Sequence, residues 1–310
     1  MRILVVGAGA IGGYFGGRLL EAGQHVTFLV RPKRAAELLR SGLRVRSRSG
    51  DMDFPNPPTI LAEDIRETFD LVLLSCKAYD LEGAVASFAP AVGPDNHILP
   101  LLNGMRHLNY LDERFGRDRV LGGRCLIAAS LNEEREIIHL NNNHELSFGE
   151  RDGTLSTRVT AIANAMDKAR FTVRVSQEII PDMWSKWVFL ASLASGTCLM
   201  RASIGDIVSA PQGTEFLMGL VDECSSIAAA EGFPVKASSL EQTRNMLTGR
   251  DSTLTSSMLR DMERNGPIEA DHIIGDLLLR ATQAGLSTNG GVPLLHLAYT
   301  HLKAYEMRSA

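Results

Sequence analysis

The sequence predicts an α/β fold: a doubly wound parallel sheet followed by an all-helical C-terminal domain. Three observations lead to this prediction. Short β-branched runs alternate with helical patterns in the first half, a glycine-rich loop follows the first strand, and the strand pattern ends near Pro181. The change of pattern places a domain boundary near residue 175, which gives domains 1–175 and 176–310.

The first domain is expected to contain at least five strands. The apolar runs "RILVVG" and "DLVLLS" are continuous, as is typical of strands that are buried on both faces. Strands are predicted at 2–7, 25–30, 70–75, 97–102 and 120–128, with helices at 11–22, 32–41 and 80–89. The stretch 135–150, "REIIHLNNNHELSFGE", predicts two strands joined by an Asn-rich turn, a hairpin appended to the sheet.

The second domain shows helical periodicity. Apolar residues between Phe216 and Ala228 recur on one helical face, and Gly232 suits the position after that helix. "SSLE" at 238–241 matches a capping box, with Ser238 followed by Glu241 three residues later. A helix over 269–285 and another that opens with a proline at 293 complete the domain.

Composition excludes several classes of protein. Of the 310 residues, 45% are apolar and 22% charged, and the net charge of −4 gives no basic excess for nucleic acid. The run 187–200 is shorter than the roughly 20 apolar residues that a membrane helix needs. The four cysteines form no CxxC motif and are expected to be core thiols. We therefore expect a cytoplasmic protein that binds neither nucleic acid nor membrane.

The loop "GAGAIG" places Gly7, Gly9 and Gly12 in the G-x-G-x-x-G spacing. It follows a strand and opens a helix, the context in which such a loop binds a dinucleotide pyrophosphate in a Rossmann-type domain. Gly7 suits the tight turn, Gly9 lets the backbone approach the pyrophosphate, and Gly12 lets helix and strand pack closely. The alternative is a glycine-rich turn without a ligand.

The residue at the end of the second strand indicates which cofactor binds. An acidic residue there would contact the ribose 2′-hydroxyl of NAD, but this chain has Arg31, with Lys33 and Arg34 close behind. A guanidinium can hold a 2′-phosphate through charge-assisted hydrogen bonds, whereas a carboxylate would repel it. We therefore expect NADP(H), with Arg31 as the main contact; the alternative is a solvated charge cluster at a helix start.

Two further strands end in polar residues. The strand at 70–75 leads to Lys77, and the strand at 97–102 leads to Asn103. Ligands of doubly wound sheets bind outside the carboxyl ends of the strands. We expect both side chains to line the edge of the sheet that carries the glycine loop.

Taken together, these segments resemble the ketopantoate reductases (2-dehydropantoate 2-reductases). The matching pieces, in the family's order and over nearly the whole chain, are "GAGAIGGYFGGRLLEAGQHVTFLVR", "CKAYD", "LLNGM", "WSKW", "SSMLRDM" and "IEADHIIGDLLLRA". The glycine loop is common to many dehydrogenases, and the remaining pieces are much more specific.

The resemblance implies NADPH-dependent reduction of a 2-keto acid to a 2-hydroxy acid, as in pantothenate biosynthesis. It implies Lys186 as general acid, Glu269 as the group that holds the reacting end of the substrate, and Ser257 as a ligand of its carboxylate. The cofactor site is expected at Gly7, Ala8, Gly9, Ala10, Ile11, Gly12, Arg31, Lys77 and Asn103, and the substrate site at Asn103, Ser257 and Lys77. Glu269 and His272 are spaced i, i+3, but one such pair is too little for a metal site, and none is expected.

One departure from the family concerns the substrate. The family usually carries asparagines four and eight residues after the lysine, where this chain has Leu190 and Ala194. A substrate hydroxyl would lose a partner there, which favours a keto acid more apolar than ketopantoate. Three alternatives stay open: another two-domain hydroxyacid dehydrogenase, a non-catalytic NADP(H) sensor, and a Lys186 that merely reaches past Trp184 and Trp187 to water. A monomer and a homodimer are both compatible with the sequence.

Overall fold

The computed structural model describes residues 1–286 and 291–309 of the chain. The chain folds into two compact units. Unit 1 comprises Met1–Leu102 and His107–Ile180, and unit 2 comprises Asn103–Arg106 and Pro181–Ala310. The short segment after the strand at 97–100 therefore belongs to the second unit, although its neighbours on both sides belong to the first.

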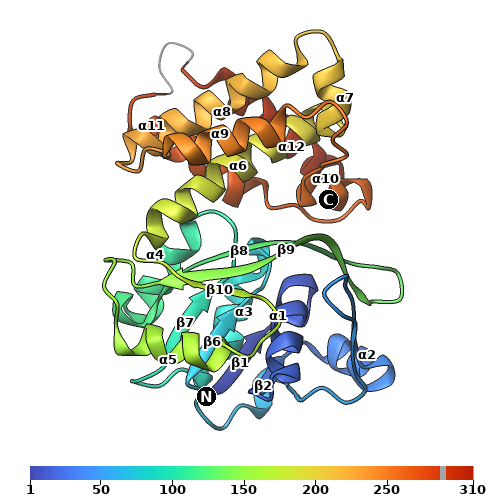
Figure 1. The fold of residues 1–310 in the computed structure, drawn as a ribbon, viewed down its shortest axis with the longest axis vertical. Helices are drawn as coiled ribbons and strands as arrows, with labels where there is room; N and C mark the ends of the chain where they lie inside the picture. Colours follow the sequence, from blue (N-terminus) through green and yellow to red (C-terminus); the bar gives the residue numbers. More distant parts are fainter. Residues whose placement is uncertain (287–290, 310) are drawn as a thin grey trace. The chain divides into compact units, whose positions relative to one another are not determined.

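The first sheet of unit 1 is parallel throughout, with the strand order β5-β2-β1-β6-β7 (Figure 1). Its strands are β1 (Arg2–Val6), β2 (His25–Leu29), β5 (Thr59–Ile60), β6 (Leu71–Leu74) and β7 (His97–Pro100). The helices that accompany it are α1 (Ala10–Glu21), α2 (Pro32–Ser41), α3 (Leu81–Phe88), α4 (Arg106–Phe115) and α5 (Thr157–Met166). The four predicted strands of this sheet and the helices at 11–22, 32–41 and 80–89 are confirmed.

The second sheet of unit 1 corrects the predicted hairpin. Its strands are β3 (Leu43–Arg46), β4 (Met52–Phe54), β8 (Gly122–Leu131), β9 (Ile137–Gly149) and β10 (Thr172–Val175). Residues 137–149 are one continuous strand that pairs antiparallel with β8. The register shifts between Ile127 and Ala129, and the Asn141 side chain accepts a hydrogen bond from the Ala128 N–H at that point. The Asn-rich run is therefore an irregular part of one strand, where the Asn141 side chain satisfies a backbone N–H that the shifted pairing leaves.

Helix α1 packs against strands of both sheets, and its glycines make this possible. A Cβ on Gly16 would lie 2.5 Å from the Phe28 ring of the first sheet, and a Cβ on Gly13 would lie 2.3 Å from Ile137 of the second. Any larger residue at these positions would push the helix away from one sheet. The sequence "AIGGYFGG" thus brings the helix that follows the glycine loop into the centre of the core of unit 1.

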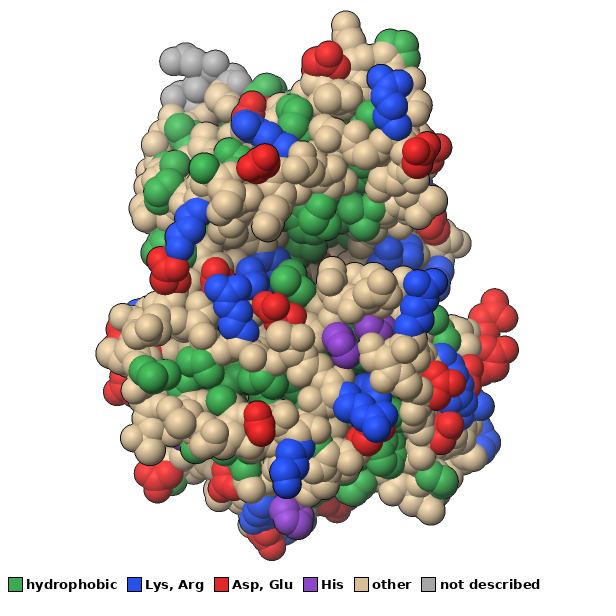
Figure 2. Space-filling view, in the orientation of Figure 1, with side chains coloured by type: hydrophobic (Ala, Val, Ile, Leu, Met, Phe, Trp, Pro, Cys, Tyr) green, Lys and Arg blue, Asp and Glu red, His purple; other side chains and the backbone are tan. Residues whose placement is uncertain are grey.

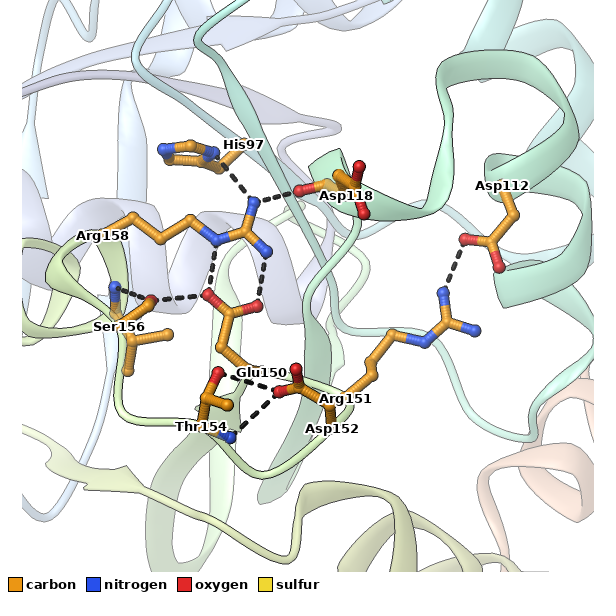
Figure 3. A network of polar contacts seen from close by, with 10 residues as sticks. His97, Asp112, Asp118, Glu150, Arg151, Asp152, Thr154, Ser156 and Arg158 are labelled. Carbon is orange, nitrogen blue, oxygen red and sulfur yellow. Dashed lines mark hydrogen bonds and ion pairs between the residues drawn. The ribbon is translucent and has the colours of Figure 1, made fainter.

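A network of polar contacts connects the end of β9 with the start of β7 (Figure 3). Glu150, which follows β9, accepts hydrogen bonds from Ser156 Oγ and Arg158 Nε, both 2.5 Å long. Arg158 also contacts the Asp118 carbonyl and His97 at the start of β7. Burial opposes ionisation of Glu150, but its bonds to Arg158 and Ser156 outweigh burial and lower its pKa. These contacts join β9, α5 and β7, so we assign them a structural role.

Unit 2 is helical, which confirms the predicted fold class (Figure 1). Its helices are α6 (Ile179–Met200, which begins in unit 1), α7 (Ile204–Ser209), α8 (Gly213–Ala230), α9 (Ala237–Leu247), α10 (Ser257–Glu263), α11 (Asp276–Gln283) and α12 (Pro293–Ser309). Helix α8 packs against α7, α9, α11 and α12. One cluster of its core contains Leu193 of α6, Leu217 and Val221 of α8, and Leu247 of α9.

The predicted capping box at Ser238 is wrong. Helix α9 begins at Ala237, and the Lys236 carbonyl already accepts a bond from Leu240 N–H, so Ser238 lies inside the first turn. The capping box that does form is in α7, where Ser203 and Asp206 bond to each other's backbone N–H groups. The helix predicted over 269–285 contains a π-helical turn near its start, Asp271–Gly275, and the N–H of Asp276, which follows this turn, bonds to the Asp271 carbonyl.

On the face drawn in Figure 2, basic and acidic side chains are interspersed over both units. No helix among the described residues is long and apolar enough to cross a membrane. Within residues 1–286 and 291–309, no group of three or more His, Cys, Asp or Glu side chains is arranged to hold a metal ion. Cys125, Cys198 and Cys224 are buried thiols, as expected, but Cys76 is only partly buried.

Candidate functional site

The glycine loop joins β1 to α1 in the conformation that the motif requires. Gly7 has a φ of +94°, a left-handed conformation that favours glycine, and its N–H donates to the Leu29 carbonyl of β2. A Cβ on Gly12 would lie 2.1 Å from Ser75 Oγ and 2.2 Å from the Gly7 carbonyl oxygen. Gly7 and Gly12 are therefore required by the fold itself.

Gly9 is different, because the protein leaves open space beside it. A Cβ on Gly9 would meet no described atom within 4 Å. The residue precedes α1, whose first turn contains no acidic side chain. A helix N-terminus with open space at its glycine fits a pyrophosphate, since both the N–H groups and the helix dipole favour an anion. The loop residues Gly7 to Gly12 thus fit a dinucleotide.

Arg31 lies at the end of β2, directly before α2, and 73% of its side chain is exposed. Its Nη2 donates to Asp80 Oδ1 at 2.6 Å, and the hydrogen bond and charge of Asp80 raise the pKa of Arg31. The segment that contains Cys76 and Tyr79 lies close enough to influence the same guanidinium. The structure therefore brings Arg31 to the segment that follows β6, where Lys77 begins a short 3₁₀ turn. Asp80 is a partner that the sequence analysis missed.

Arg34 also supports the glycine loop. Its Nε donates to the Ala8 carbonyl at 3.1 Å, and its Nη1 pairs with Glu37 at 3.0 Å. Burial lowers the pKa of Arg34 despite this pair. The sequence analysis grouped Arg34 with the charges around Arg31, but its side chain turns back to brace the loop from the protein side.

In unit 2, Lys186 lies in α6 and is partly buried, and in sequence it stands between Trp184 and Trp187, whose buried rings contact each other with centroids 4.9 Å apart. Trp187 Nε1 donates to the Ile273 carbonyl at 3.0 Å. Ile273 lies in the π turn, four residues after Glu269, which is 8% exposed. This bond holds the turn of α6 that carries Lys186 against the helical segment that carries Glu269.

The same segment contacts Asn103. A hydrogen bond joins the His272 ring to the Asn103 backbone, and this bond raises the pKa of His272, so the ring nitrogen is the donor. Burial outweighs that bond and the nearby charge of Glu269, and the pKa of His272 is lowered overall. Gly104, with a φ of +73°, packs against His272 so closely that a Cβ would lie 3.0 Å from the His272 carbonyl oxygen. Asn103 is thereby held beside the segment that carries Glu269.

Ser257 lies in another part of unit 2, on α10. It is exposed at the first position of α10, after Ser256, whose side chain caps that helix. Ser256 Oγ accepts from Thr197 Oγ1 at 2.9 Å. Thr197 lies eleven residues after Lys186, about 16 Å along the axis of α6. The described contacts thus link Asn103, Glu269 and the Lys186 turn with one another, and they link Ser256 with the later turns of α6.

Leu190 and Ala194, the positions that depart from the family, differ in exposure. Leu190 is partly buried, and Ala194 is 3% exposed. Ser195, the next residue, has a buried hydroxyl for which the described residues supply no hydrogen-bond partner. Leu190 is thus the one partly exposed side chain between positions 190 and 195, and it is apolar.

Comparisons with known proteins identify the family of the chain. The ketopantoate reductase PanE/ApbA family matches residues 3–153, and the C-terminal domain of that family matches residues 178–306. An uncharacterized oxidoreductase, YkpB of Bacillus subtilis, is 36% identical over 306 residues, which cover 99% of both chains. A 2-dehydropantoate 2-reductase of Archaeoglobus fulgidus is 26% identical over 96% of both chains.

A solved structure has the same fold over the whole chain. The 2-dehydropantoate 2-reductase of Methylococcus capsulatus superimposes with a TM-score of 0.85 and 26% identity, covering 100% of this chain and 98% of that one. The matched residues include the glycine loop of unit 1 and the Lys186 and Glu269 segments of unit 2. The chain therefore belongs to the ketopantoate reductase PanE/ApbA family and is an oxidoreductase of that family.

Proposed function

We propose that this protein reduces a 2-keto acid to the 2-hydroxy acid with NADPH, the substrate being 2-dehydropantoate or a related keto acid. The observation that carries the proposal is the Trp187–Ile273 hydrogen bond, which holds the Lys186 turn against the segment that carries Glu269. A cation and a carboxylate on adjoining buried segments suit an acid–base role at a carbonyl group.

The dinucleotide would be held by Gly7–Gly12, with Arg31 at the adenosine 2′-phosphate and Lys77 and Asn103 nearer the reacting end. When bound, NADPH supplies the hydride. The Arg31 guanidinium has five N–H donors, and Asp80 engages one of its nitrogens, Nη2, so donors remain for a phosphate. The preference for NADPH over NADH rests on this exposed guanidinium.

Lys186 is proposed as the general acid. Reduction places negative charge on the carbonyl oxygen of the substrate, and an ammonium group within hydrogen-bond reach stabilises that charge and delivers the proton. Partial burial strengthens such an interaction, because less water competes for the oxygen. Glu269 is proposed to hold the reacting end of the substrate, and Asn103 and Ser257 to bind its polar groups.

Within this class of substrates, we propose a preference for a keto acid more apolar than the hydroxylated 2-dehydropantoate. Leu190 and Ala194 offer no hydrogen-bonding side chain where the family usually has asparagines. A substrate hydroxyl buried against them would lose a partner, which costs about 1 to 3 kcal/mol. An alkyl or aryl group there would gain from leaving water.

The proposal is tested by NADPH oxidation with 2-dehydropantoate and a panel of apolar 2-keto acids. We expect turnover with at least one apolar keto acid, and Lys186→Ala should lower kcat by about 10²- to 10⁴-fold with NADPH affinity nearly unchanged. Far better turnover of 2-dehydropantoate would refute the apolar preference. NADPH binding without turnover of any keto acid would indicate a sensor, and oxidation of 3-hydroxy acids would indicate the other class of dehydrogenase.

A further inference from the structure

The π turn Asp271–Gly275 lies within the predicted helix 269–285, directly before α11, and its backbone bonding departs from that of an α-helix. Ile273 N–H still bonds to the Glu269 carbonyl, four residues back, whereas Asp276 N–H bonds five residues back to Asp271. Such turns are rare and occur frequently at functional sites, since the less regular backbone is retained only where other contacts favour it. The contacts of this turn lead to three of the predicted site residues.

One contact leads to Lys186. Trp187, 1% exposed, follows Lys186 directly and donates its indole N–H to Ile273 in the π turn. Arg280 of α11 lies over the rings of Trp184 and Trp187, with its guanidinium carbon 5.4 and 5.6 Å from their centroids. Asp276 and Glu231 in turn bind Arg280. The Trp187 indole is therefore held by two contacts: its N–H bonds to Ile273, and its ring packs under Arg280.

A second contact leads to Asn103. His272 donates to the Asn103 backbone, and Gly104 lies against the His272 backbone and ring. Because His272 is the second residue of the π turn, a change in the path of the turn would move the partner of Asn103.

A third set of contacts anchors the turn on α12. Asp271, its first residue, accepts hydrogen bonds from Tyr299 Oη at 2.7 Å and Lys303 Nζ at 2.9 Å. These bonds outweigh burial and lower the pKa of Asp271. Gly275, its last residue, lets the Tyr299 ring approach, since a Cβ would lie 3.1 Å from that ring. The turn is thus held at both ends.

We infer that the π turn Asp271–Gly275 is a positioning element for the proposed reduction. It fixes the Lys186 turn through Trp187 and the Asn103 loop through His272, both relative to Glu269 two residues before the turn. Trp187 and His272 are the positioning residues, and neither is needed to exchange protons with the substrate. The inference rests on the proposed function, and its test includes a measurement that needs no turnover.

The main test compares Trp187→Phe with Trp184→Phe. Both exchanges shrink a buried ring beside Arg280 by the same amount, but only the first removes the N–H that bonds to Ile273. We expect Trp187→Phe to lower kcat by about 10- to 100-fold, with KM and NADPH affinity within about threefold, because a misplaced acid group affects the transition state most. Trp184→Phe should keep kcat within about threefold. Full kcat in Trp187→Phe, or equal losses in both variants, would overturn the inference.

The measurement without turnover uses an amine-reactive reagent. Peptide mass spectrometry then gives the rate at which this reagent labels Lys186. We expect Trp187→Phe to change this rate and Trp184→Phe to leave it unchanged, with Lys33 of unit 1 as an internal reference. If the native protein reduces no keto acid, the proposed function fails, and the labelling rate alone decides the inference. An unchanged rate in Trp187→Phe then refutes it.

A second pair of variants covers the case in which Trp187→Phe does not fold. His272→Leu removes the donor to Asn103, whereas His272→Gln keeps a side-chain N–H donor. We expect His272→Leu to lower kcat/KM by about tenfold and His272→Gln to restore most of it. Equal losses in the two variants, at equal thermal stability, would overturn the role of His272.

Discussion

Exchanging Gly12 for alanine should destabilise the protein, whereas exchanging Gly9 for alanine should leave its stability nearly unchanged, and both exchanges should weaken NADPH binding. A methyl group on Gly12 would lie 2.2 Å from the Gly7 carbonyl oxygen, about 1 Å inside the ordinary contact distance. Because backbone atoms cannot rotate away, the loop must shift. Overpacking of this kind costs about 1 to 3 kcal/mol in the free energy of unfolding.

Gly9→Ala meets no such obstacle. Gly9 has a φ of −83° and a ψ of −163°, an extended conformation that alanine adopts freely. Alanine is a poorer residue than glycine at the position before a helix, which costs about 0.5 to 1 kcal/mol. The exchange also makes the unfolded chain stiffer, which offsets about 0.4 to 1 kcal/mol of that cost. The nucleotide-free Gly9→Ala protein should therefore unfold within about 0.5 kcal/mol of the native protein. Its methyl group occupies the open space that a pyrophosphate needs, so the Kd for NADPH should rise tenfold or more, about 1.4 kcal/mol.

The assays are urea unfolding of the nucleotide-free proteins and a fluorescence titration with NADPH. Gly12→Ala should lose both stability and affinity, and Gly9→Ala should lose affinity alone. Native affinity in Gly9→Ala would refute the assignment of this loop to the pyrophosphate, and would favour a glycine-rich turn without a ligand.

Three further predictions concern the cofactor, pH and stability. Arg31→Asp should abolish the preference for NADPH over NADH, with Lys33→Asp as control; an unchanged ratio of kcat/KM values would remove Arg31 from the 2′-phosphate site. Burial lowers the pKa of His97, His144, His272 and His301, so the unfolded chain binds more protons below about pH 6.5. Stability should therefore fall as pH drops from 6.5 through the folded pKa values, and an equal urea midpoint at pH 7.5 and 5.5 would contradict this. Glu150→Gln should cost about 2 kcal/mol in unfolding free energy while leaving NADPH affinity unchanged, because it weakens the Arg158 bonds far from the glycine loop.

The local patterns of the chain predicted the elements well where one physical rule dominated. Continuous apolar runs marked β1 and β6, and the glycine spacing marked the turn before α1. The local patterns gave wrong predictions where one short stretch is compatible with two different structures. The Asn-rich run at 141–143 has turn chemistry, but pairing with β8 along both flanks keeps it inside β9. Ser238 has capping chemistry, but the helix had already begun at Ala237.

The candidate site divides in the same way. The sequence identified Lys186, Glu269, Asn103 and the glycine loop as candidate site residues, because a motif is recognised by the identity and spacing of its residues. The sequence did not identify the contact partners of the site segments. These partners lie far away in sequence: Asp80 is 49 residues from Arg31, Ile273 is 86 from Trp187, and His272 is 169 from Asn103. No local pattern predicts the contacts of such distant residues.

By itself, the sequence predicted the class of fold, the conformation of the glycine loop and the identity of the candidate acid, since these depend on periodicity, on glycine's conformational freedom and on side-chain chemistry. Only the tertiary structure decided which segments hold that acid in place. The helix that carries Lys186 contacts a π turn, and the 3.6-residue periodicity of the sequence does not predict that turn. That turn depends on Tyr299, Lys303 and Trp187, contacts that exist only once the helices have packed.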